Sequence, residues 1–233
     1  MITYPPTRSS TRLASLFLSA WLGGWALFSA GCATRGYEKA EATSDAVTAA
    51  SAQADLTLRQ IDDATASLHL LADNPPVDLK TPLEQYRARV AALERSVAQL
   101  REQTDDMAKQ GRNYFDTWDQ RLSQMQNEDI RARSAARQQE VASRFTDIQR
   151  RYQDSRRALE VLMPNLRDIQ SALSIDLTPQ GVQGVREVVA QTDRNATAAR
   201  EALRTLSEGL RSLGSTLRPA TTPAPAPVTS SGM

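Results

Sequence analysis

A three-and-four spacing of apolar or small residues recurs through most of this 233-residue chain and constrains its fold more than any other feature. The spacing continues for about five heptads in each of four segments, which is the pattern of helices that pack as coiled coils. The segments are Ala40–Leu71, Leu83–Met125, Val141–Leu173 and Val182–Leu217. Short connectors make consecutive long helices antiparallel. The sequence therefore predicts an all-α fold, an elongated antiparallel bundle of about four long helices over residues 39–217 with coiled-coil-like packing.

Proline and capping residues separate the four segments. Pro75 and Pro76 cannot continue a helix and end the first segment, and Pro164 predicts a kink inside the third. A side-chain oxygen just before a helix caps its free amide groups, and proline is favoured at the first helical position. The predicted starts of the second, third and fourth helices are Thr81 with Pro82, Asn127 or Asp129, and Thr178 with Pro179.

Charge and side-chain size predict how the second and third segments pair. Residues 101–129 hold seven acids and four bases, whereas residues 131–157 hold eight bases and three acids. Folding back at the intervening turn would place an acidic flank beside a basic one, where each exposed pair is worth about 0.2–1 kcal/mol. Solvated charge on both faces is the alternative interpretation. The same fold-back places the small Gly111 opposite the large Phe145.

The composition excludes several classes of function. The chain has 28 basic and 27 acidic residues and a formal net charge of +1, so no overall field attracts nucleic acid, which we do not expect as a partner. Cys32 is the only cysteine, which excludes an internal disulfide, and His69 is the only histidine. A zinc site needs several nitrogen or sulfur ligands, so the sequence predicts no metal and no cofactor.

No catalytic arrangement stands out in the sequence. The phosphate-binding motif G-x-x-x-x-G-K-[ST] is absent. His69 lies beside an alanine-rich seam, as a half-exposed helical residue does, and the consecutive acids Asp62 and Asp63 diverge on a helix. We expect Trp118 to pack in the core or at the end of the bundle rather than to form a recognition patch. The sequence therefore predicts that the protein is not an enzyme.

The first 31 residues have the pattern of a bacterial export signal. Arg8 and Arg12 precede an apolar run, Leu13–Gly31, which ends in small residues directly before Cys32. A transmembrane anchor that stays uncleaved is the alternative, because about 18 apolar residues is near the lower limit for crossing a bilayer. Cys32 would then be an incidental residue beside the membrane or a free thiol.

The sequence LFSAGC resembles the lipobox of bacterial lipoproteins. Ala30, Gly31 and Cys32 match its most constrained positions, whereas Ser29 stands where leucine is usual. The resemblance implies cleavage before Cys32, a diacylglycerol on its sulfur and an acylated amino group, and two or more chains anchor a protein stably. Ala33 in place of aspartate favours the outer membrane. The predicted domains are a signal peptide (1–31), a tether (32–38), the bundle (39–217) and a disordered Pro/Ala/Thr-rich tail (218–233).

Two stretches in the second and third segments resemble the uncharacterised bacterial lipoprotein family called domain of unknown function 2959. Its members carry a tryptophan with acidic neighbours, a turn with asparagine, and a tyrosine-led stretch that ends in a methionine and proline motif. The matching residues are Trp118, Asp119, Asn127, Ile130, Arg131, Ser134, Tyr152, Met163 and Pro164. The adjacency of Met163 and Pro164, and the segment SALSIDL after them, depart from the family pattern. The resemblance implies a helical, exported, lipid-anchored protein and no assigned activity.

These observations predict a lipid-anchored, periplasm-facing envelope protein that works as a structural or protein-interaction scaffold. Its membrane contact would be the lipid on Cys32, and its helix faces could bind envelope proteins or a second copy of the chain. One alternative is an accessory factor or enzyme of cell-wall metabolism. A second is a signal-anchored protein with a single membrane span.

Overall fold

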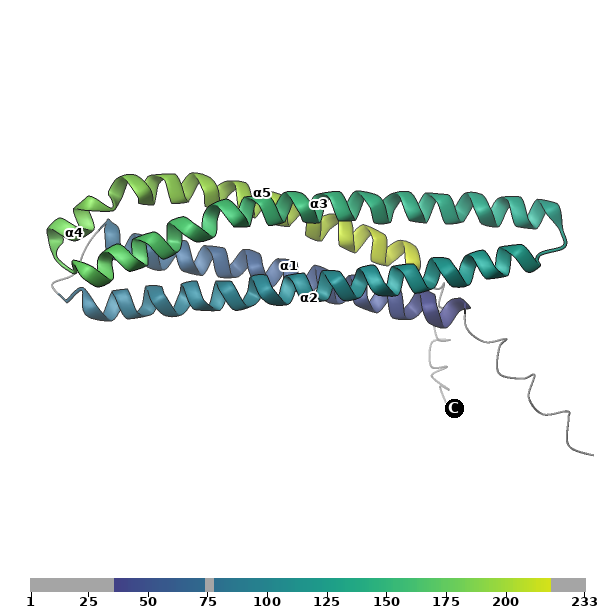
Figure 1. The fold of residues 1–233 in the computed structure, drawn as a ribbon, viewed down its shortest axis with the longest axis horizontal. Coiled ribbons are helices and arrows are strands. Elements are labelled where there is room, and N and C mark those ends of the chain that lie inside the picture. Colours follow the sequence, from purple (N-terminus) through teal and green to yellow (C-terminus); the bar gives the residue numbers. More distant parts are fainter. Residues whose placement is uncertain (1–35, 74–77, 219–233) are drawn as a thin grey trace, which may run out of the picture. The chain divides into compact units, whose positions relative to one another are not determined.

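The structure, a computed structural model, describes residues 36–73 and 78–218. Five helices make up these residues: α1 (Gly36–Ala72), α2 (Lys80–Gln124), α3 (Glu128–Ile175), α4 (Pro179–Gly184) and α5 (Arg186–Leu217). Four of them are long and run antiparallel to their sequence neighbours (Figure 1). The predicted all-α bundle is therefore confirmed for the described part of the chain. The predicted signal peptide, Cys32 and the residues after Arg218 lie outside the described residues.

Each long helix packs against two others. Helix α1 packs against α2 and α5, and α3 completes the ring by packing against α5 and α2, so α1 lies diagonally across from α3. The seam residues predicted from the heptad spacing form the core between these helices. In the fourth segment every predicted seam position is buried, from Val182 and Val185 through to Leu217.

Small residues allow α1 to approach its neighbours closely. Ala50, Ala54 and Ala64 of α1 are fully buried. Some hydroxyl groups in the same seam bond across the helices, since buried polar groups need a hydrogen-bond partner. The Thr57 hydroxyl lies 2.8 Å from the Ser96 hydroxyl of α2, and Ser51 is 3.3 Å from Ser207 of α5. The seam of α1 is thus polar in part, and these two hydroxyl pairs bond across it.

Larger side chains fill the space between α2 and α3. The fully buried Tyr86 donates its hydroxyl to the carbonyl of Leu166 at 2.8 Å, and burial raises the pKa of that hydroxyl. Gly111 faces Phe145 as the sequence predicts, since a Cβ at position 111 would lie 2.6 Å from Cε1 of the phenyl ring. The ring of Phe145 also packs edge-on against Phe115, with centroids 5.3 Å apart.

The helix caps agree with the predictions in part. Asn127 caps α3 by accepting from the amide of Ile130 at 3.0 Å, and Thr178 caps α4 by accepting from Gly181 at 3.1 Å. The predicted Thr81 cap is wrong. Helix α2 begins at Lys80. The carboxylate of Asp78 precedes the free amide groups of this helix and accepts a hydrogen bond from the Lys80 amide at 3.0 Å.

Three helix boundaries differ from the predictions or extend them. The fourth segment is two helices, because the chain turns at Val185 between α4 and α5. Helix α1 begins at Gly36, so residues 36–38 of the predicted tether are helical. Helix α3 continues through Pro164 to Ile175.

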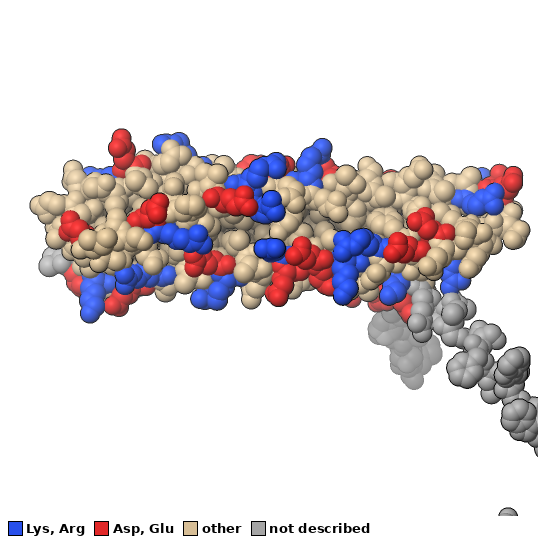
Figure 2. All heavy atoms as spheres, viewed as in Figure 1, with Lys and Arg blue, Asp and Glu red and all other residues tan. Residues whose placement is uncertain are grey.

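The basic flank of α3 has a different arrangement from the one predicted. Arg144 and Arg151 pair with acids one turn earlier in α3, Glu140 at 3.0 Å and Asp147 at 2.6 Å. Arg151 also donates to a backbone carbonyl of α5 rather than to an acid of α2. Nearby opposite charges in the same helix satisfy these arginines, because residues three or four apart lie side by side on a helix. Figure 2 shows the two signs of charge interleaved along the visible face.

Candidate functional site

The residue predicted to carry the lipid, Cys32, lies outside the described residues. The structure describes the chain from Gly36 onward, and residues 33–35 join the two. Candidate sites on the bundle itself are therefore a cleft around His69 near one end of α1 and a groove around Trp118 near the other.

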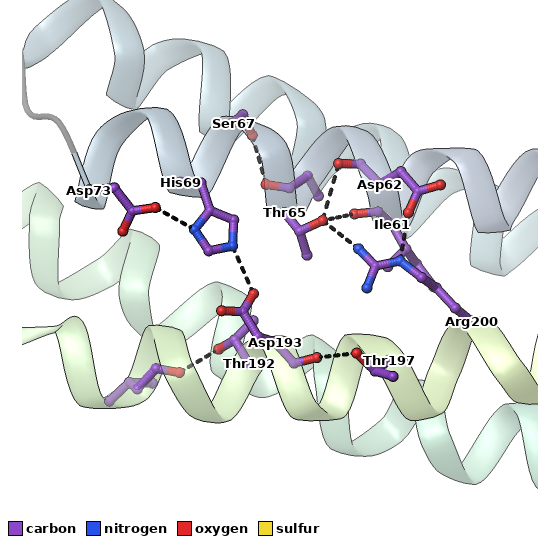
Figure 3. A network of polar contacts seen from close by, with 12 residues as sticks. Ile61, Asp62, Thr65, Ser67, His69, Asp73, Thr192, Asp193, Thr197 and Arg200 are labelled. Carbon is purple, nitrogen blue, oxygen red and sulfur yellow. Dashed lines mark hydrogen bonds and ion pairs between the residues drawn. The ribbon is translucent and has the colours of Figure 1, made fainter.

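The His69 cleft lies where the end of α1 meets α5. Both ring nitrogens of His69 contact carboxylates: Nδ1 lies 2.8 Å from Asp73, just after α1, and Nε2 lies 2.9 Å from Asp193 of α5 (Figure 3). The cleft has a volume of about 260 Å³ and is lined by His69, Ala72, Asp73, Arg186, Val189, Ala190 and Asp193. The side chain of His69 is 40% exposed, which agrees with the half-exposed position predicted for it.

The two carboxylates control the protonation of His69. Partial burial disfavours the charged imidazole, but the hydrogen bonds to Asp73 and Asp193 outweigh that effect and raise the pKa of His69 above its ordinary value. A protonated ring can donate to both carboxylates at once, whereas a neutral ring has a single N–H to donate. Protonated His69 therefore clamps α1 to α5, and loss of the proton weakens one side of the clamp.

A second polar contact joins the same two helices further along. Arg200 of α5 bonds Asp62 at 2.5 Å and donates to the hydroxyl of Thr65 at 2.7 Å (Figure 3). The neighbouring Asp63 instead pairs with Arg89 of α2 at 3.3 Å. The consecutive acids Asp62 and Asp63 thus diverge to different helices, as the sequence predicts, and each holds a different neighbour of α1.

The Trp118 groove lies where α1 begins against α2. Its volume is about 280 Å³, and its lining is Gly36, Tyr37, Ala40, Tyr114, Thr117, Trp118, Arg121 and Met125. The rings of Tyr114 and Trp118 contact each other with centroids 5.3 Å apart. The indole of Trp118 donates to the hydroxyl of Ser134 in α3 at 2.9 Å, so this tryptophan packs at the end of the bundle while one side of it lines the groove.

The described residues also bear on metal binding and membrane crossing. Within residues 36–73 and 78–218, no group of three or more His, Cys, Asp or Glu side chains could hold a metal ion. In the same ranges, no helix has both the length and the apolar character that a membrane span requires.

A comparison with known protein families matches residues 29–208 to a family described as a protein of unknown function, DUF2959. The chain belongs to this family. The DUF2959 match includes Cys32, α1 to α4 and most of α5. No curated protein matches the chain.

Several residues that carry the DUF2959 resemblance stabilise the turn between α2 and α3. Trp118 bonds Ser134 across the two helices, and Asn127 caps α3. Arg131 donates to the carbonyl of Met125 at 3.1 Å and thereby closes the connecting turn. Four of the residues that carry the resemblance therefore hold the α2–α3 turn together, namely Trp118, Asn127, Arg131 and Ser134.

The sequence did not indicate the partners of His69. Asp193 is 124 residues away along the chain, and a single histidine among helical residues carries no signal for a distant carboxylate. Asp73 lies four residues after His69, and that spacing was the one local hint of the pair.

Proposed function

We propose that this protein is a lipid-anchored component of the bacterial cell envelope whose helical bundle acts by contact with other proteins. The observation that carries the proposal is the position of Cys32 between the apolar run Leu13–Gly31 and the start of α1 at Gly36. A lipid on Cys32 would leave the bundle outside the membrane and three residues from its anchor. The DUF2959 match begins at residue 29 and therefore includes Cys32.

Expression of the full chain in a bacterium with a lipoprotein export pathway tests the anchor. We expect the mature protein to begin at Cys32, to carry the mass of attached acyl chains and to partition into the detergent phase. The Cys32→Ser variant should lose both the added mass and the partition. A mature N-terminus at Met1, or unchanged partition of Cys32→Ser, would refute the anchor.

A matched variant tests the imperfect position of the lipobox. Ser29 stands where leucine is usual, so Ser29→Leu should increase the fraction of chain that is cleaved and acylated. The fraction is measured by intact mass in a pulse-labelled sample. A decrease in that fraction would contradict the assignment of LFSAGC as a processing site.

The scaffold role rests on the exposed helix faces. Val161 in α3 is a large apolar residue that is 56% exposed, and we choose it as the probe position for a protein-binding face on this helix. Because residue 33 is alanine rather than aspartate, we place the protein in the outer membrane, facing the periplasm. A photo-crosslinking amino acid at Val161 should capture a reproducible neighbour in living cells.

The polar exposed residue Gln120 in α2 is the matched control position for this crosslinking. Adducts at Val161 that exceed those at Gln120 would support a protein-binding face on α3. Absence of adducts at both positions, together with a monomeric protein, would refute the scaffold role.

A further inference from the structure

The hairpin tip, residues 118–136, projects past the start of α1. Helices α1 and α2 are antiparallel, and the hydroxyl of Thr43 donates to the carbonyl of Gln110 at 3.2 Å, which sets their register. Gly36 therefore lies level with residue 117, and α2 continues to Gln124. Seven further residues at a 1.5 Å rise add about 10 Å beyond the start of α1. The projection of α2 and α3 past α1 and α5 is visible in Figure 1.

Apolar side chains remain uncovered on the hairpin tip because α1 and α5 do not extend along it. Ile130 is 58% exposed, and Leu122 and Met125 are half-buried. A second groove of about 590 Å³ lies on this tip, lined by Leu122, Ser123, Glu128, Arg131, Ala132 and Ala135.

The short connection to Cys32 limits how far the hairpin tip can lie from a lipid anchor. Residues 33–35 separate Cys32 from Gly36, and four peptide steps span at most about 14 Å. The tip reaches about 10 Å back past Gly36, in the direction opposite to the course of α1. With an acylated Cys32 held at the bilayer surface and the bundle axis along the membrane normal, even a fully extended connection leaves the tip within about 4 Å of that surface.

The orientation of the bundle changes the distance from the tip to the bilayer within narrow limits. A shorter connection brings the tip closer, whereas a bundle that lies flat raises the tip by about 10 Å, to the level of Gly36. Inversion of the bundle is excluded, because α1 would then have to pass through the membrane. We propose that the hairpin tip, through Met125 and Ile130, rests in the headgroup region of the bilayer that holds the Cys32 lipid; this inference rests on the proposed lipid anchor.

The charge of the hairpin tip indicates the kind of lipid surface that it contacts. Its acids are Asp119, Glu128 and Asp129, and its bases are Arg121, Arg131 and Arg133, so the formal charges cancel. A tip without net charge gains little from anionic lipids, whose attraction depends on clustered basic residues. The contact should therefore form on zwitterionic vesicles and change little when anionic lipid is added.

A single fluorescent label on the full lipidated protein tests the contact. In that protein the Cys32 sulfur is already in a thioether, so Ile130→Cys provides one reactive thiol. Ile175→Cys at the far end of α3, where the native residue is 89% exposed, is the matched control. On phosphatidylcholine vesicles with a spin-labelled lipid as quencher, we expect several-fold stronger quenching at position 130 than at position 175.

A longer connection tests whether the anchor imposes the contact. Ten Gly/Ser residues inserted after Arg35 raise the reach of the connection to about 20 Å as a flexible chain. Quenching at position 130 should fall toward the value at position 175, while flotation with the vesicles is retained.

The outcomes separate this proposal from the one on which it rests. Equal quenching at the two positions, in a protein that floats with the vesicles, overturns the tip contact and leaves the anchor standing. Quenching at position 130 that is unchanged by the longer connection overturns the role of the short connection. A protein that does not float with vesicles overturns both the anchor and the contact.

Discussion

Replacing Gly111 by alanine should destabilise the bundle, although the same replacement favours most helices. A Cβ at position 111 would lie 2.6 Å from Cε1, 3.2 Å from Cδ1 and 3.2 Å from Cζ of Phe145. The ring cannot simply swing away, because Phe145 is buried and packs edge-on against Phe115. The added methyl group therefore forces α2 and α3 apart or pushes the ring off its preferred rotamer.

The size of the effect follows from two opposing contributions. Alanine is more favourable than glycine in a helix interior by about 1 kcal/mol. Overpacking of a well-packed core costs about 1–3 kcal/mol. The difference is a net loss of about 1 kcal/mol for Gly111→Ala, which in a domain of this size lowers the Tm by roughly 2–4 °C.

Two other helical glycines are matched controls in the same bundle. At Gly214 a Cβ would meet its nearest atom, of Val47, at an ordinary 3.5 Å, so Gly214→Ala should stabilise by about 0.5–1 kcal/mol. At Gly209 a Cβ would lie 2.7 Å from the terminal methyl of Ile148, which can rotate away. The stability of Gly209→Ala should therefore lie between those of Gly111→Ala and Gly214→Ala. Urea unfolding followed by circular dichroism measures all three on one scale.

The order of the three glycine variants is the test of the reasoning. Gly111→Ala as stable as Gly214→Ala would show that the Phe145 ring yields freely and that size complementarity does not restrain this part of the core. A double variant, Gly111→Ala with Phe145→Leu, should lose less stability than the sum of the two single changes. Strict additivity would contradict a direct clash between the two side chains.

Three further predictions concern single polar contacts. Because the pKa of His69 is raised, the clamp is complete below about pH 6.5 and is lost as the pH rises through the folded-state pKa. His69→Gln should therefore lower the free energy of unfolding by about 0.2–1 kcal/mol near pH 6 and by less above pH 8. Equal losses at the two pH values would contradict the clamp. Tyr86→Phe should cost about 1 kcal/mol in urea unfolding because the 2.8 Å bond to Leu166 is lost, and an unchanged midpoint would show that bond to be without net value. Asn127→Ala should lower the free energy of unfolding by about 1 kcal/mol, because α3 loses its cap. Asp129→Ala leaves that cap in place and is the control variant.

The heptad spacing alone determined most of the fold. Because a helix seam repeats locally, residues such as Leu68, Leu93 and Leu203 could be assigned to the core before their partners were known, and all three are fully buried. The Asn127 cap could also be predicted, because it follows from local turn chemistry. The Gly111–Phe145 contact could be predicted because it follows from a single fold-back of the chain. The start of α2 at Lys80, whose amide bonds Asp78, was missed because Thr81 with Pro82 has the signature of a helix start.

Only the tertiary structure decided which helices meet and how far each extends. A 3.5-residue period is the same in every segment, so it contains no information on axial register or on the choice of neighbour. Contacts such as Thr43 with Gln110 set that register, and the unequal lengths of the four long helices then leave residues 118–136 projecting beyond the others. The meeting of His69 with Asp193 depends on the same packing, because it joins two helices whose local sequences carry no sign of each other.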